Sequence, residues 1–125
     1  MRGEKKIKEK VTVIVIGFNA RPIASSAKRA EFTVLAVDYW GDLDLAKSSD
    51  DVETVLRQVA GERPREELRK PVSELLVECA EEISARHHGK VDFILVGSGL
   101  DDRPDLWRRL GEIAPILGNS TEVVK

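Results

Sequence analysis

The sequence predicts a three-layer α/β domain in which helices cover both faces of an open parallel sheet of about four strands. Three apolar, β-branched runs support this prediction, at residues 11–16, 33–37 and 91–96. Runs without polar alternation are typical of strands buried on both faces of a parallel sheet. Helical patterns separate the runs, so we expect right-handed crossovers and a first strand at the centre of the sheet.

Length and composition are those of one globular domain. The chain has 125 residues, of which 42% are hydrophobic and 34% are charged. This length can bury a core without disulfides. We expect a basic lead-in over residues 1–10 and a single α/β domain over residues 11–125. The high charge and scarcity of amide side chains are typical of proteins from thermophiles.

Charge and hydropathy also limit the expected partners and location. The net charge is −2, so no basic field predicts a nucleic-acid partner. No apolar run approaches the ~20 residues of a membrane span, and no secretory signal begins the chain. The single Cys79 excludes an internal disulfide and fits a reducing cytosol, so we expect a cytoplasmic protein.

The first βαβ unit is the clearest element. Its first strand ends at Gly17, and Pro22 suits the first turn of the following helix because its missing N–H would be unpaired there. The second strand ends at Asp38. A weaker pattern predicts a short helix through residues 52–59, after a Ser-Ser-Asp-Asp cluster.

The second half predicts a long helix, two strands and a shorter helix. Apolar side chains at helical spacing run over residues 68–88, and Pro71 either starts or kinks this helix. Gly89 is placed as its C-terminal cap. Pro104 opens a further helix, and residues 115–117 form the fourth expected strand.

Polar residues follow the first strand at the edge of the sheet where ligands bind in open α/β folds. Gly17, Asn19, Ala20 and Arg21 form a loop before a helix, where backbone N–H groups and an arginine can hold phosphate or carboxylate. An ordinary solvent-exposed arginine is an equal alternative. Asp38 stands at the spacing of a ribose-binding acid, but the dinucleotide glycine fingerprint is absent.

A second candidate loop follows the third expected strand. The glycines of Gly97, Ser98 and Gly99 allow close approach of a ligand, although a plain turn explains them equally well. We interpret the following pair, Asp101 and Asp102, as a helix cap rather than as metal ligands.

Structural roles can explain the other residues whose side chains could bind a ligand or a metal. Tyr39 and Trp40 form either a stacking platform or a packing contact. His87 and His88 lie about 100° apart on a helix, which precludes a shared metal, so we interpret them as helix-end residues. We assign no catalytic residue and no metal ligand to this chain.

These residues resemble a known family. The segments VIVIGFNARPIASSAKRAEFTVLAVDYWGDLD, VDFILVGSGLDDRPDLW and PILGNSTEVVK resemble the amino-terminal, pre-ATP-grasp domain of archaeal ATP-grasp proteins. Those proteins are described as predicted ATP-dependent carboligases related to biotin carboxylase. The resemblance covers nearly the whole chain and implies a Rossmann-like fold.

The resemblance implies a division of labour. The later domains of such ligases bind ATP and Mg²⁺, and the amino-terminal domain helps to hold a small carboxylate substrate through loops at its strand ends. On this reading the chain is a substrate-side domain, inactive alone, whose partner is an ATP-grasp domain in cis or on a separate chain. A stand-alone nucleotide- or small-anion-binding module and a structural or protein-interaction domain remain the alternatives.

Two further expectations concern particular positions. The family usually has glycine after the first helix, where this chain has Glu31, and the tight exit into the next strand predicts a left-handed residue there. In a complete ligase this domain would pack against the other domains. We therefore expect an exposed apolar patch near residues 118–124, which self-association into a homo-oligomer could cover.

Overall fold

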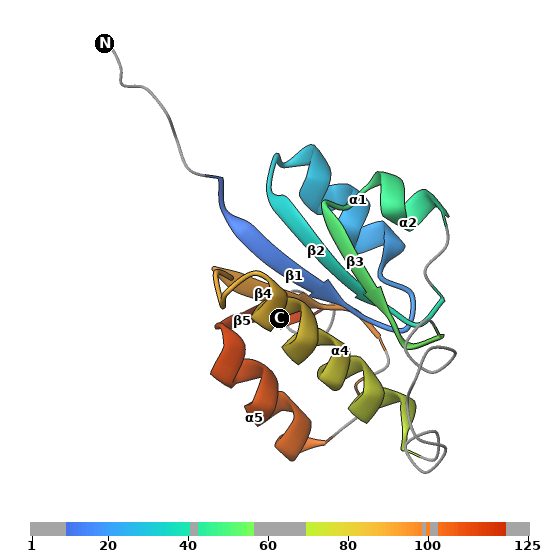
Figure 1. Cartoon of the computed structure of the whole chain (residues 1–125), viewed down its shortest axis with the longest axis vertical. Coiled ribbons are helices and arrows are strands. Elements are labelled where there is room, and N and C mark those ends of the chain that lie inside the picture. Colours follow the sequence, from blue (N-terminus) through green and yellow to red (C-terminus); the bar gives the residue numbers. More distant parts are fainter. Residues whose placement is uncertain (1–9, 41–42, 57–69, 99, 101–102, 120–125) are drawn as a thin grey trace.

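Five parallel strands form one sheet in the order β3-β2-β1-β4-β5, with β1 at the centre. The computed structural model describes residues 10–40, 43–56, 70–98, 100 and 103–119. The strands and helices appear along the chain as β1 (Thr12–Ile16), α1 (Arg21–Arg29), β2 (Thr33–Asp38), α2 (Leu43–Lys47), β3 (Asp51–Thr54), α4 (Val72–Arg86), β4 (Phe93–Val96), α5 (Pro104–Ile113) and β5 (Ile116–Asn119). Figure 1 shows this arrangement, which confirms the α/β class, the parallel sheet and the central first strand.

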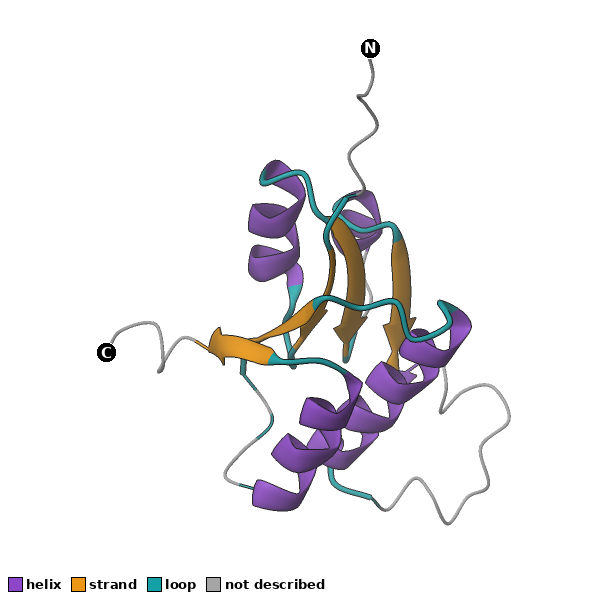
Figure 2. Ribbon diagram, turned by 90° about the vertical axis from the view of Figure 1, so that its left-hand side faces the viewer, coloured by secondary structure: helices purple, strands orange, loops and turns teal. Residues whose placement is uncertain are grey.

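Helices cover both faces of the sheet, as expected (Figure 2). Successive side chains of β1 point to opposite faces because the side-chain period of a strand is two. Ile14 and Ile16 are buried in a core with α4 and α5. Val13 and Val15 are buried in a second core with α1 and α2. All four are fully buried, and each contributes about 1.5–3 kcal/mol by leaving water.

One strand more than predicted is present, because the segment expected to be helical through residues 52–59 begins as β3. Asp51–Thr54 pairs with β2 in parallel register. Its alternation explains the strand: Val52 packs toward α1, whereas Asp51 and Glu53 accept hydrogen bonds from Arg86 of α4. A helical turn starts only at Val55, and residues 57–69 lie outside the described part of the chain.

Helix α4 starts rather than kinks at proline, since Pro71 is its N-cap and Val72 its first residue. The predicted start at Leu68 lies outside the described residues. The helix ends in a Schellman motif: Gly89 N–H donates to the Ser84 carbonyl and His88 N–H donates to the Ala85 carbonyl. Gly89 therefore takes part in the cap, but His88, with φ of 60°, occupies the left-handed position after His87.

Helix α1 ends in the same motif, with Glu31 in the left-handed position. Glu31 has φ of 69°. Its N–H donates to the Lys28 carbonyl, and Phe32 N–H donates to the Ala27 carbonyl. The sequence-based expectation of a left-handed residue at Glu31 is therefore confirmed.

The last strand, β5, lies at one edge of the sheet and carries an exposed Leu117. Among the described residues near the predicted patch, Leu117 is the one exposed large apolar side chain, at 60% exposure. Residues 120–125 lie outside the described part of the chain, so the patch itself stays a prediction. Within the described residues, no helix is both long and apolar enough to cross a membrane.

Candidate functional site

Asp38 ties together the loops that follow β1 and β2. Its Oδ1 accepts a 2.6 Å hydrogen bond from Ala20 N–H, and its Oδ2 accepts a 2.9 Å hydrogen bond from Trp40 N–H. The residue is only 4% exposed. A buried carboxylate needs such donors, because an unpaired one would be costly. Asp38 thus holds two loops of the carboxyl edge, the sheet edge at which the strands end.

Gly17 and Gly97 let the ends of β1 and β4 approach closely. A Cβ on Gly17 would lie 3.2 Å from the Ser98 carbonyl oxygen, and one on Gly97 would lie 2.9 Å from Cδ1 of Ile23. Phe18 N–H donates a 2.7 Å hydrogen bond to the same Ser98 carbonyl. Close packing therefore explains both glycines, against the backbone of β4's end at Gly17 and against the Ile23 side chain at Gly97. The third predicted residue of that loop, Gly99, lies outside the described residues.

Arg21 lies at the start of α1, where the sequence predicted an anion contact. Asn19 Oδ1 accepts a long 3.4 Å contact from Arg21 N–H, which shapes the turn into the helix. The Arg21 guanidinium lies 3.3 Å from a carboxylate oxygen of Asp44, on α2. Both side chains are largely exposed. Arg21 is thus a surface cation whose position is biased by one exposed acid.

Three aromatic side chains gather at the carboxyl edge. Phe18 and Tyr39 are stacked with ring centroids 5.0 Å apart. Trp40 meets both rings edge-on, at 5.8 Å from Phe18 and 4.8 Å from Tyr39. Trp40 is nevertheless 57% exposed. Both readings of the Tyr39-Trp40 pair therefore have support, because the rings pack together and still offer an aromatic face to solvent.

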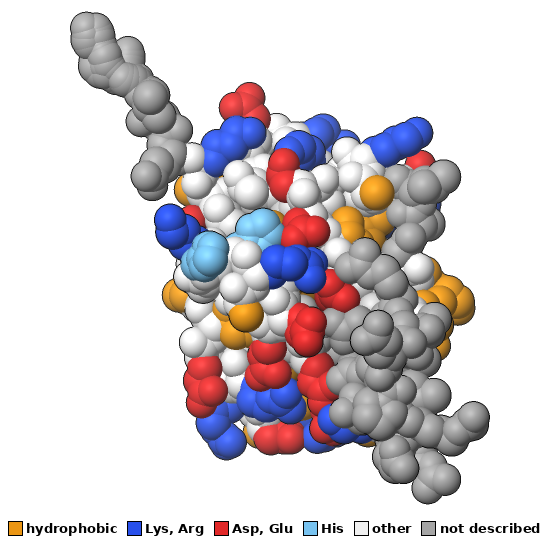
Figure 3. All heavy atoms as spheres, in the orientation of Figure 1, with side chains coloured by type: hydrophobic (Ala, Val, Ile, Leu, Met, Phe, Trp, Pro, Cys, Tyr) orange, Lys and Arg blue, Asp and Glu red, His pale blue; other side chains and the backbone are white. Residues whose placement is uncertain are grey.

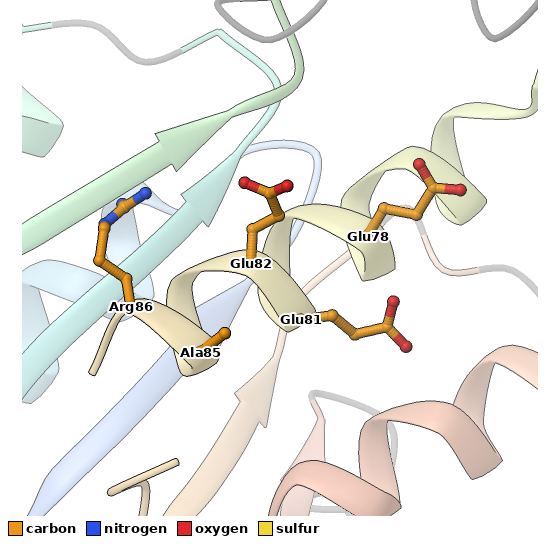
Figure 4. A pocket seen from close by; sticks show the side chains of 5 residues that line it. All are labelled: Glu78, Glu81, Glu82, Ala85 and Arg86. Atoms are coloured by element: carbon orange, nitrogen blue, oxygen red, sulfur yellow. The ribbon is translucent and has the colours of Figure 1, made fainter. Parts of the chain in front are cut away.

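A hollow of about 700 Å³ lies along α4, far from these loops in sequence. Figure 4 shows Glu78, Glu82 and Arg86 on one side of the helix, while Glu81 points toward α5. Three of these charged side chains form ion pairs. Arg86 contacts Asp51 and Glu53, and Glu78 contacts Lys70. Glu81 accepts two hydrogen bonds from Arg109. Acidic and basic side chains are correspondingly mixed over this face (Figure 3).

The two histidines lie at the end of α4, as interpreted from the sequence. His87 Nε2 lies 2.7 Å from Asp51 Oδ2, so this contact adds to the ion pairs of Arg86 that link α4 to β3. Within the described residues, no group of three or more His, Cys, Asp or Glu side chains is arranged to hold a metal ion. Asp101 and Asp102 lie outside that part of the chain.

The structure brings most of the predicted loop residues to one edge but gives them different surroundings. Asp38 is buried within the loops, Gly17 and Gly97 lie in close packing, and Arg21 reaches the surface. A second hollow, of about 430 Å³, was not predicted from the sequence. It is lined by Arg21, Pro22, Ser25, Asp44, Lys47 and Ser48. It joins two helices that are separated in sequence, so only the packing of α1 on α2 reveals it.

Comparison of the chain with protein-family models, with curated proteins and with solved structures finds no match in any of the three.

Proposed function

We propose that this chain is the substrate-side domain of an ATP-grasp carboxylate ligase. In this proposal it holds a small carboxylate at the carboxyl edge of its sheet, and a partner ATP-grasp domain, in cis or on a separate chain, supplies ATP and Mg²⁺. The ATP-phosphorylated carboxylate would then be attacked by a nucleophile. The chain alone would not catalyse this reaction.

The observation that carries the proposal is the anchoring of the loops after β1 and β2 by Asp38. Hydrogen bonds from the N–H groups of Ala20 and Trp40 to the buried Asp38 hold the two loops at this edge. The same anchored loops present Arg21 and the Trp40 ring to solvent. Rigid backbone that carries exposed polar and aromatic side chains suits both a ligand and a docking partner.

The burial of Asp38 also bears on the nucleotide-binding alternative. In a dinucleotide site the acid after the second strand hydrogen-bonds ribose hydroxyls. Here each oxygen of Asp38 already accepts a backbone N–H, and the residue has 4% of its surface exposed. This geometry argues against a dinucleotide-type module in which Asp38 would bind ribose.

The proposal is tested by reconstitution. We expect isothermal titration of the whole chain with MgATP to show no saturable binding. We expect a co-expressed ATP-grasp polypeptide, encoded beside this chain's gene, to release ADP only when this chain and a carboxylate are both present. Tight MgATP binding by the chain alone, or ADP release that is the same without the chain, would contradict the proposal. The first result would support the stand-alone nucleotide module instead.

A further inference from the structure

The hollow between α1 and α2 combines cations, hydroxyls and one acid. Arg21, Pro22 and Ser25 line it from the first half of α1, and Asp44, Lys47 and Ser48 line it from α2 and the residue after it. Both helices follow strands that end at the carboxyl edge, so the hollow opens beside the loops anchored by Asp38. Figure 1 shows α1 and α2 side by side on one face of the sheet.

Three polar side chains in this hollow have no polar contact within the described part of the protein. Arg21 has its 3.3 Å contact with Asp44, whose side chain is 66% exposed. Among the described residues, no hydrogen bond or ion pair engages the side chains of Lys47, Ser25 or Ser48. One cation and two hydroxyl groups therefore face the hollow without a protein partner in that part of the chain.

The charges identify the kind of ligand. Arg21 and Lys47 contribute two positive charges and Asp44 one negative charge, so the hollow has a net charge of +1. One monoanion would balance it. A guanidinium binds a planar carboxylate through two parallel hydrogen bonds, while an ammonium and hydroxyl groups add single donors. A phosphate, with nearly two negative charges at neutral pH, would meet more repulsion from Asp44.

We propose that the α1–α2 hollow is the carboxylate-binding site of this domain, with Arg21 as its main anchor and Lys47 as the second cation. This inference rests on the proposed function, because it locates the carboxylate that the function requires. Asp44 competes with the ligand for Arg21 and so limits the affinity of the hollow for simple anions.

The test is a titration of the whole ¹⁵N-labelled chain with sodium acetate, at constant ionic strength maintained with chloride. We expect saturable amide shifts in the segments that line the hollow. Arg21→Gln and Lys47→Gln should each weaken binding by about tenfold, the effect of losing one charge-assisted contact of about 1.4 kcal/mol. Asp44→Asn should tighten binding, because it removes a negative charge beside Arg21.

Arg29→Gln is the matched control, since Arg29 lies on the same helix, is exposed and does not line the hollow. It should leave acetate binding unchanged. Equal weakening by Arg29→Gln and Arg21→Gln, or weaker binding by Asp44→Asn, would overturn the site. Tighter binding of inorganic phosphate than of acetate, sensitive to the same variants, would overturn the carboxylate assignment.

The outcomes also separate this inference from the proposed function. Carboxylate-dependent ADP release with a partner, together with no acetate binding in the hollow, would reject the site and keep the function. Acetate binding with no ATP-dependent activity in any reconstituted mixture would keep the site and reject the function.

Discussion

The two edges of the sheet use charged residues differently. At the amino edge, where strands begin, acids pair with basic side chains and backbone donors: Asp50 binds Lys28 and Val34 N–H, Asp51 binds Arg86 and His87, and Asp92 accepts from Thr12 N–H. At the carboxyl edge one buried acid, Asp38, anchors the loops, while a cation and aromatic rings face solvent. Acids at the amino edge thus bind groups of neighbouring elements. The carboxyl edge also has ion pairs, Arg21 with Asp44 and Arg103 with Asp105, but these are largely exposed and lie at the same edge as the exposed Trp40 ring.

The substitution Asp38→Ala should have the largest effect on stability and tests the contrast between the two edges. The substitution leaves the N–H groups of Ala20 and Trp40 without their acceptor, so we expect a loss of about 2–4 kcal/mol of unfolding free energy. Chemical denaturation followed by circular dichroism measures it. Asp92→Ala is the amino-edge control, because Asp92 is exposed and accepts one hydrogen bond; we expect a loss of about 0.5–1 kcal/mol. Equal losses would mean that Asp38 is no special anchor.

We expect low pH to weaken the ion pairs at the amino edge. Burial raises the pKa of Asp51, but hydrogen bonds from His87, Arg86 and Val52 N–H outweigh it, and the pKa lies below the ordinary 3.8. The pKa of Asp50 is lowered in the same way, by Val34 N–H and Lys28 against burial. A depressed folded-state pKa gives stability that is present above the unfolded pKa and is lost as the pH falls through the folded one.

We therefore expect the melting temperature to fall steeply below about pH 4. The double variant Asp50→Asn/Asp51→Asn should melt lower than the native chain at pH 7, and the gap should narrow toward pH 3. A gap that stays constant with pH would show that these ion pairs do not control acid stability.

The exposed aromatic cluster should matter little for stability. Trp40→Ala removes edge contacts with Phe18 and Tyr39 but also removes a side chain that is 57% exposed. We expect a loss below about 1 kcal/mol in the same denaturation assay. Its neighbour Asp38 is the comparison, and a loss as large as that of Asp38→Ala would show that the cluster is part of the core rather than a free surface.

The smallest expected effect is a gain at the amino edge. Glu31 has φ of 69°, and its side chain forms no ion pair among the described residues. Glycine removes the left-handed strain and the negative charge at the C-terminus of α1, and both changes stabilise the folded state. Glycine also increases the conformational entropy of the unfolded chain, which costs less. We therefore expect Glu31→Gly to raise the free energy of unfolding by about 0.5 kcal/mol. Ala30→Gly is the control: Ala30 has φ of −80°, so the same glycine should destabilise there. A lower melting temperature for Glu31→Gly would show that the backbone of Glu31 is not strained.

The sequence predicted the elements whose side chains follow a strong period. The helix after Pro22 is of this kind. The strand β1 was predicted from its uninterrupted apolar run, and the left-handed Glu31 from the short distance between α1 and β2. Strand β3 was missed because it has only four residues, two of them acids, and is specified by pairing with β2 and Arg86.

The candidate site was predictable only in part. Arg21 could be placed at the edge from its position after a strand. The acceptor role of Asp38 could not, because its donor at Ala20 is 18 residues away and is a backbone group. Lys47 and Ser48 carry no motif, and only the packing of α2 beside α1 brings them near Arg21.

The most direct test of the contrast between the edges is an amide map of the whole chain. Its ¹⁵N spectrum would be recorded with and without the co-expressed ATP-grasp polypeptide, MgATP and a carboxylate. We predict that the perturbed amides are those of the carboxyl edge, among them Phe18, Arg21 and Trp40, while those of Glu31, His88 and Asp92 stay unchanged. Perturbation confined to the amino edge would contradict the account.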